Sequence, residues 1–101
     1  IKKALELIES NYHKDISLDE ISEKLNISPY YFSKLFKENQ GEGFIEYLTR
    51  KRIDKAKLML TDPEKSIKEI GIACGYSDPN YFSRIFKKST GMTPSEYKEK
   101  L

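Results

Sequence analysis

Apolar residues recur every three or four positions along almost the whole sequence, the spacing that gathers them on one face of an α-helix. The pattern predicts a first helix over residues 1 to about 13 and a long helix over residues 44 to about 61. The buried side of the long helix is expected to carry Ile45, Leu48, Ile53, Ala56, Met59 and Leu60. No segment shows the strict alternation of apolar and polar residues that indicates a strand. The sequence therefore predicts an all-α fold of about seven helices.

The chain contains two copies of one unit. Residues 29–47 read PYYFSKLFKENQGEGFIEY and residues 79–97 read PNYFSRIFKKSTGMTPSEY, and 9 of these 19 positions are identical. Equivalent residues lie 50 positions apart here and 49 apart upstream, which places a one-residue insertion in the second copy near Asp78. Two copies of so short a unit indicate a pair of similar modules, because a solenoid needs at least about three repeats.

Both copies carry the same signals for the start and end of helices. A serine followed three residues later by a glutamate predicts a capping box, and a residue that tolerates a left-handed backbone is expected to end the short helix that follows. These residues are Ser17, Glu20 and Asn26 in the first copy, and Ser66, Glu69 and Gly75 in the second. Ser28-Pro29 and Asp78-Pro79 then predict the start of a second helix in each copy.

A short helix, a tight turn and a capped second helix, repeated twice, predict a tandem helix-turn-helix layout. The whole chain is interpreted as one domain, with a first helix-turn-helix subdomain at residues 1–41 and a second at residues 62–101. Residues 42–61 form the linking helix between them, which at roughly 27 Å is expected to hold the two modules apart. A third capping box at Thr93 and Glu96 is expected to begin the closing helix.

Each second helix is predicted to have a buried apolar stripe and an opposite polar face. The stripe is Phe32, Leu35 and Phe36 in the first copy, and Phe82, Ile85 and Phe86 in the second. The polar face is Tyr30, Ser33, Lys34 and Lys37 in the first copy, and Asn80, Ser83, Arg84 and Lys87 in the second. We call each of these polar faces a ridge. A ridge of this kind fits the major groove of double-stranded DNA.

The residue types on the ridges suit the recognition of bases and phosphates. Arg84 can donate two hydrogen bonds to O6 and N7 of guanine, and Asn80 can pair with N6 and N7 of adenine. The predicted base contacts are Tyr30, Ser33, Lys34, Asn80, Ser83 and Arg84. The predicted phosphate contacts are Ser17, Lys37, Arg50, Lys51, Ser66, Lys87 and Lys88. The alternatives are an ordinary solvated helix face and a helical protein-interaction module that has lost DNA binding.

The composition narrows the class of function. The 101 residues hold 18 basic and 16 acidic side chains, so the net charge of +2 does not by itself indicate nucleic acid. One cysteine and one histidine are too few for a disulfide, a cysteine zinc site or a histidine-based catalytic centre. We therefore expect no cofactor, no metal and no enzymatic activity. Cys74 matches Leu25 in the repeat and is interpreted as a core residue rather than as a methyl acceptor for DNA repair.

Residues from the linking helix to the end of the chain form a sequence pattern that is specific enough to compare with known families. It consists of Tyr47, Leu48, Arg52, Ile53, Ala56, Met59 and Leu60, with IKEI at 67–70, GYSD at 75–78, YFSRIFKK at 81–88 and GMTPSEY at 91–97. With this pattern the chain resembles the DNA-binding domain of the AraC/XylS family of bacterial transcription regulators. The resemblance implies that both second helices enter successive major-groove segments of one duplex, and that the matching ridge residues make the contacts.

The resemblance also implies partners outside the chain. This domain is then the C-terminal part of a longer cytoplasmic regulator, with an N-terminal sensor or receiver domain and RNA polymerase as partners and no membrane attachment. The first helix and the aromatic-rich style are closest to family members fused to two-component receiver domains. Gly71 and Lys98 depart from the family pattern, which favours alanine and arginine there. A glycine inside a helix costs about 1 kcal/mol, so Gly71 either loosens its helix or permits close packing.

Overall fold

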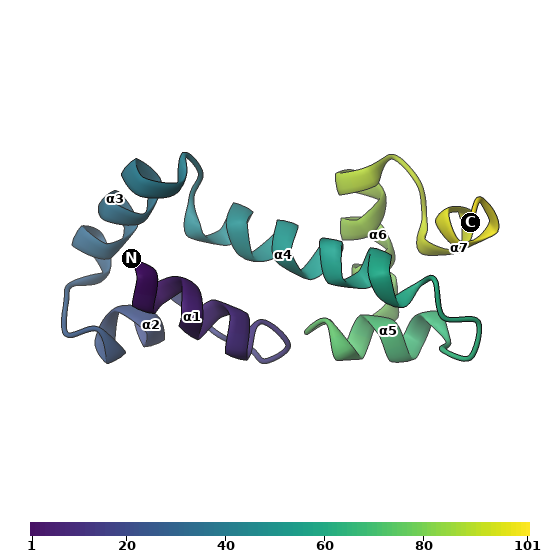
Figure 1. Cartoon of the computed structure of the whole chain (residues 1–101), viewed down its shortest axis with the longest axis horizontal. Helices are drawn as coiled ribbons and strands as arrows, with labels where there is room; N and C mark the ends of the chain where they lie inside the picture. Colours follow the sequence, from purple (N-terminus) through teal and green to yellow (C-terminus); the bar gives the residue numbers. More distant parts are fainter. The chain divides into compact units, whose positions relative to one another are not determined.

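The structure is a computed structural model that describes all 101 residues and contains seven α-helices and no strand (Figure 1). The helices are α1 (Lys2–Asn11), α2 (Leu18–Lys24), α3 (Pro29–Gln40), α4 (Phe44–Met59), α5 (Ile67–Ala73), α6 (Pro79–Thr90) and α7 (Pro94–Glu99). The predicted all-α fold is confirmed. None of these helices combines the length and the hydropathy that crossing a bilayer requires.

The chain divides into two compact units, Ile1–Thr49 and Arg50–Leu101, and each has its own hydrophobic core. The first core is built from Ala4, Ile8, Ile21, Phe32, Phe36, Phe44 and Leu48. The second core is built from Ile53, Ala56, Leu60, Ile70, Cys74, Tyr76, Phe82 and Phe86. In both units two phenylalanines of one helix lie fully buried in the core, and this helix is α3 in the first unit and α6 in the second.

The buried side of α4 differs from the prediction at one position. Ile45 is 64% exposed, whereas Phe44, one residue earlier, is buried in the first core. Successive residues of a helix are about 100° apart, so Phe44 and Leu48 share one face and Ile45 is turned away from it. The prediction was wrong at this position because Phe44 and Ile45 are both apolar, so the helical pattern fits with either residue on the buried face.

The capping of the short helices is complete in one unit and partial in the other. The backbone N–H of Glu69 donates to Ser66 Oγ at 3.1 Å, and the backbone N–H of Ser66 donates to Glu69 Oε1 at 3.3 Å, which is a full capping box. In α2 the backbone N–H of Glu20 donates to Ser17 Oγ at 3.1 Å. The Glu20 carboxylate accepts from the Ser17 hydroxyl at 3.3 Å, so the predicted box at Ser17 is only half formed. The glutamate there binds the cap side chain in place of the cap backbone.

Positive backbone angles end both short helices where the sequence predicts. Asn26 has φ of 58° and Gly75 has φ of 100°, each two residues after the last residue of its helix. The closing helix also begins as predicted, since the backbone N–H of Glu96 donates to Thr93 Oγ1 at 3.2 Å and that of Thr93 donates to Glu96 Oε1 at 2.8 Å. The hydrogen bond from the backbone N–H of Thr93 to the carboxylate, together with one from the Thr93 side chain, holds the pKa of the Glu96 carboxyl below its ordinary value.

Gly71 permits close packing of α5 on α6. A β-carbon at this position would lie 2.9 Å from Cδ2 and 3.1 Å from Cγ of Phe82, and the shorter distance is one that β-carbons essentially never show. In the first unit the equivalent residue is Ser22, which is buried and donates from Oγ to the carbonyl oxygen of Asp19 at 2.9 Å. The glycine is therefore a packing feature of the second unit.

Candidate nucleic-acid interface

The sequence sets the orientation of α3 through its cap and its aromatic stripe. Ser28 caps the helix by accepting from the backbone N–H of Tyr31 at 3.1 Å, and Pro29 occupies the first turn. Phe32 and Phe36 are fully buried, with their rings edge to face at 5.7 Å. Because both phenylalanines are fixed in the core, the opposite side of α3 faces solvent.

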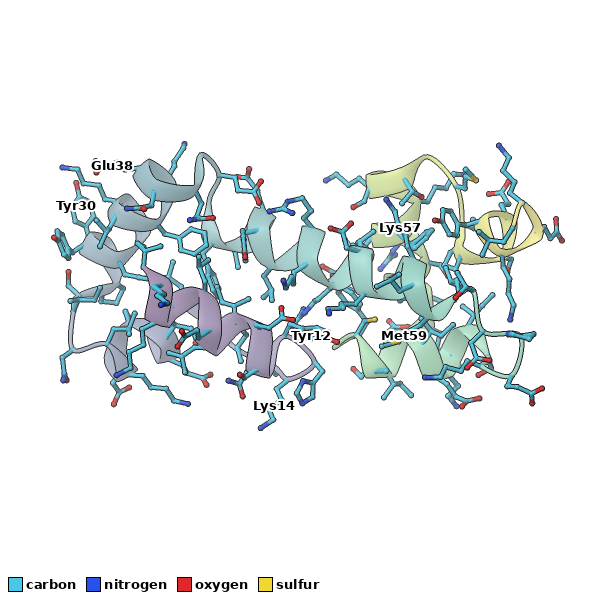
Figure 2. All side chains as sticks on the ribbon, in the orientation of Figure 1. Tyr12, Lys14, Tyr30, Glu38, Lys57 and Met59 are labelled. Carbon is cyan, nitrogen blue, oxygen red and sulfur yellow. The ribbon has the colours of Figure 1, made fainter.

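The first ridge lies on this solvent-facing side. Tyr30 is 81% exposed, and Ser33, Lys34 and Lys37 are exposed as well. Together with Glu38 they line one shallow depression, and Figure 2 shows Tyr30 and Glu38 projecting from α3 on the side away from α1. The predicted residues of the first ridge are therefore brought together. Sequence reasoning missed Glu38, although its place four residues after Lys34 put it on the same face.

The second ridge lies on α6, which is oriented in the same way. Asp78 caps the helix by accepting from the backbone N–H of Asn80 at 3.0 Å, and Phe82 and Phe86 are fully buried. Asn80, Arg84 and Lys87 are exposed, as the spacing predicts, but Ser83 is half-buried. Ser83 is the least accessible of the predicted base contacts, since the other five are exposed.

One aromatic ring lies beside the exposed arginine of the second ridge, and further rings lie behind it. The guanidinium carbon of Arg84 lies 5.8 Å from the ring centre of Tyr81, three residues earlier on α6. The ring of Tyr81 lies 5.9 Å from that of Tyr76, which is stacked on Phe82 at 5.7 Å with an interplanar angle of 26°. The guanidinium of Arg52 lies 5.1 Å from the centre of the Tyr76 ring. Arg52 thus lies against an aromatic ring of the second core.

The basic side chains predicted to contact phosphates occupy two kinds of position. Lys37, Lys87 and Lys88 are exposed in the last turns of α3 and α6. On α4, Arg50 is exposed and its Nη1 lies 3.9 Å from Asp54 Oδ2, while Lys51 is half-buried. An exposed pair of this kind stabilises a helix by less than about 1 kcal/mol.

The two serines predicted to contact phosphates have a structural role in their own helices. Ser17 Oγ and Ser66 Oγ each accept a hydrogen bond from the third residue of the helix that they cap. A phosphate at either position would therefore be held by the backbone amides of the first turn rather than by the hydroxyl. The predicted caps are confirmed, and the phosphate contacts at these two helix starts stay predictions.

The structure shows the contacts of two further residues, Cys74 and Lys98. Cys74 is fully buried with its Sγ 3.9 Å from Met59 Sδ, and burial raises the pKa of its thiol to about 11. Cys74 is a core residue, and such a thiol is neither accessible nor activated as a methyl acceptor must be. Lys98 donates from Nζ to the carbonyl oxygen of Lys65 at 3.1 Å.

A family model described as "Helix-turn-helix domain" matches residues 21–100. The regulatory protein PocR of Salmonella typhimurium strain LT2 is 36% identical over 101 residues, which is 100% of this chain and 33% of PocR. The chain thus spans about a third of the length of this curated relative.

Solved structures match over nearly the full chain. The C-terminal domain of the two-component response regulator yesN from Fusobacterium nucleatum is 40% identical with a TM-score of 0.92, covering 96% of this chain and 95% of that one. The C-terminal domain of AraT, a response regulator from Geobacillus stearothermophilus, is 36% identical with a TM-score of 0.96, covering 99% of this chain and 84% of that one.

Proposed function

Because the chain belongs to the AraC/XylS-type helix-turn-helix family, we propose that it binds double-stranded DNA sequence-specifically and so regulates transcription. The ridges of α3 and α6 are the proposed reading surfaces, each entering a major-groove segment. The observation that carries the proposal is the duplication of the ridge. Two units with separate cores each present hydrogen-bonding side chains at the same four helical positions on the face opposite two buried phenylalanines.

The base contacts are assigned by side-chain chemistry. Arg84 is the strongest candidate, because an exposed guanidinium can donate two parallel hydrogen bonds to guanine. Asn80 precedes it by one helical turn and suits adenine. On the first ridge Tyr30 and Lys34 occupy the equivalent positions, with Ser33 and Ser83 as the remaining proposed base contacts.

The phosphate contacts are assigned by position and charge. Lys37, Lys87 and Lys88 carry compact charges on flexible stems, which suit phosphate oxygens better than base edges. The other proposed phosphate contacts are Arg50, Lys51 and the first-turn amides at Ser17 and Ser66. These contacts would set the position of each ridge on the duplex without reading its sequence.

The complete protein has a wider role in this proposal. The chain is the DNA-binding part of a longer regulator whose other domain receives a signal, and the response-regulator relatives favour a receiver domain. In this proposal the one domain has subdomains 1–41 and 62–101, and each of the two compact units adds part of the linking helix at 42–61 to its subdomain. It acts on RNA polymerase at promoters, in the cytoplasm where bacterial DNA lies, and has no catalytic role of its own.

The experiment that tests the proposal is selection of bound sequences from random double-stranded DNA, followed by affinity measurements at several salt concentrations. We expect one preferred sequence and a steep loss of affinity with salt, because several phosphate contacts release counterions. An interaction module without DNA binding would select no sequence, and that result would contradict the proposal.

Variants then test the roles of individual residues. Arg84→Ala should cost about 1–3 kcal/mol on the selected site and relax the preference at one base pair. Lys37→Ala should weaken binding to all sequences alike and lower the salt slope by about 1. Lys3→Ala is the matched control, because Lys3 is an exposed lysine on α1 outside both ridges. Equal losses for Arg84→Ala and Lys37→Ala on every sequence would refute the division of roles.

A further inference from the structure

We propose that Tyr81 is a positioning residue for Arg84, with a ring that orients the guanidinium on the second ridge before DNA binds. The inference rests on the proposed function and adds a residue to it. Tyr81 is not one of the predicted contacts, and its proposed effect on DNA is indirect, through Arg84.

The geometry of α6 brings the two side chains together. Residues three positions apart on a helix are neighbours, and the guanidinium carbon of Arg84 lies 5.8 Å from the ring centre of Tyr81. This separation is within the about 6 Å at which a cation is attracted to an aromatic face. An arginine side chain has many rotamers, so a partner that holds it in place reduces the entropy lost when it binds a base.

Tyr81 can orient its neighbour because it is itself supported by the core. Tyr81 is 45% exposed, and its ring also lies 5.9 Å from the ring of Tyr76, with an interplanar angle of 56°. Tyr76 is only 7% exposed, is stacked on the fully buried Phe82, and donates from its backbone N–H to the carbonyl oxygen of Gly71 at 2.8 Å. A continuous series of rings therefore leads from the second core to the arginine at the surface.

The first unit provides an internal comparison. Tyr31 stands at the position of Tyr81, is 53% exposed, and makes no aromatic or cation–ring contact. The supporting tyrosine is replaced there by Ile27 and the arginine by Lys34. The arrangement is thus specific to the unit that carries the arginine, and the same tyrosine without a supporting ring does not form it.

The test measures affinity for the selected site and for a site in which the base pair read by Arg84 is changed. The proteins are the wild type, Tyr81→Leu, Tyr81→Phe, Arg84→Ala and the double variant Tyr81→Leu/Arg84→Ala. Tyr81→Leu should lose roughly three- to tenfold on the selected site and little on the changed site. Tyr81→Phe should stay within about twofold of the wild type, because it keeps the ring. The double variant should bind no more weakly than Arg84→Ala alone.

Tyr31→Leu in the first unit is the matched control and should leave the preference at the Arg84 base pair unchanged. A measurement without DNA checks the contact itself: the side-chain proton resonances of Arg84 should be shifted upfield by the ring in the wild type and in Tyr81→Phe, and not in Tyr81→Leu. Circular dichroism of each variant verifies that the helices are retained.

Four results would overturn the inference. One is an equal loss in Tyr81→Phe and Tyr81→Leu, which would make the hydroxyl a direct contact. Another is additive losses in the double variant, and the third is the absence of the upfield shift in the wild type. The fourth is a preference at the Arg84 base pair that stays undiminished in Tyr81→Leu, which would refute only the role of Tyr81. A wild-type protein without any sequence preference would refute the proposed function itself.

Discussion

The burial of Cys74 gives a quantitative prediction about its reactivity. The thiol is fully buried and its pKa is raised to about 11, against an ordinary value of 9.0. At pH 8 about one thiol in a thousand is then ionised, compared with about one in ten at the ordinary pKa. Since the thiolate is the reactive form, ionisation alone should slow labelling by a disulfide reagent about 100-fold. Burial of the sulfur adds steric protection to this factor.

A single-cysteine control separates burial from other causes. In the variant Cys74→Ala/Ala73→Cys the thiol moves by one residue to an exposed position on the same helix, α5. Labelling at pH 8 should be complete within the mixing time for the variant and at least about 100-fold slower for the wild type. In concentrated urea the two proteins should react alike. Equal rates for both folded proteins would refute the placement of Cys74 in the second core.

The same shift predicts how stability depends on pH. The folded pKa of Cys74 lies above the ordinary value of 9.0, so its contribution is complete below pH 9 and is lost as pH rises through about 11. The loss amounts to at most roughly 2–3 kcal/mol. Tyrosine and lysine also titrate in this range, so the measurement is the difference in free energy of unfolding between the wild type and Cys74→Ala. A difference that does not vary between pH 8 and pH 11 would contradict the prediction.

Four further substitutions test other features. Gly71→Ala should lower the free energy of unfolding in urea by about 1 kcal/mol, because overpacking against Phe82 outweighs the gain in helix propensity; a more stable variant would contradict the packing. Ser66→Ala should cost about 1 kcal/mol by the same measurement, and Ser17→Ala less, since its box is half formed. Glu38→Gln should raise affinity for all DNA about twofold at low salt by removing a repelled charge. Loss of one base preference in Glu38→Gln would instead show that the carboxylate accepts from a base.

The sequence predicts the helices of this chain well because particular residue types mark where they begin and end. A cap residue, a proline in the first turn and a residue at positive φ are local features, and Ser66, Pro79 and Gly75 each act as the pattern requires. The phase of α4 could not be decided in the same way. Phe44 and Ile45 are both apolar, and only the packing of the first core selects Phe44.

The candidate site could be predicted in part. Helical spacing was sufficient to place Lys34, Lys37 and Arg84 on exposed faces, because that follows from the position of the buried phenylalanines. The half-buried state of Ser83 depends on how neighbouring side chains fill the surface, which spacing does not describe. The contact between Tyr81 and Arg84 depends on ring positions, and these follow from the packing of the second core.

The two units share their buried phenylalanines but differ on their ridges. Their buried phenylalanines are the same in both copies, because a close-packed core tolerates little change in volume. On the ridges only the serine and the last lysine are shared, and the remaining positions pair Tyr30 with Asn80 and Lys34 with Arg84. The duplicated fold therefore places the ridge residues at equivalent backbone positions in both units, but two of the four side chains carry different hydrogen-bonding groups. If both ridges read bases, they must prefer different sequences, so two motifs in one chain specify an asymmetric site, whereas a dimer of identical motifs specifies a palindrome.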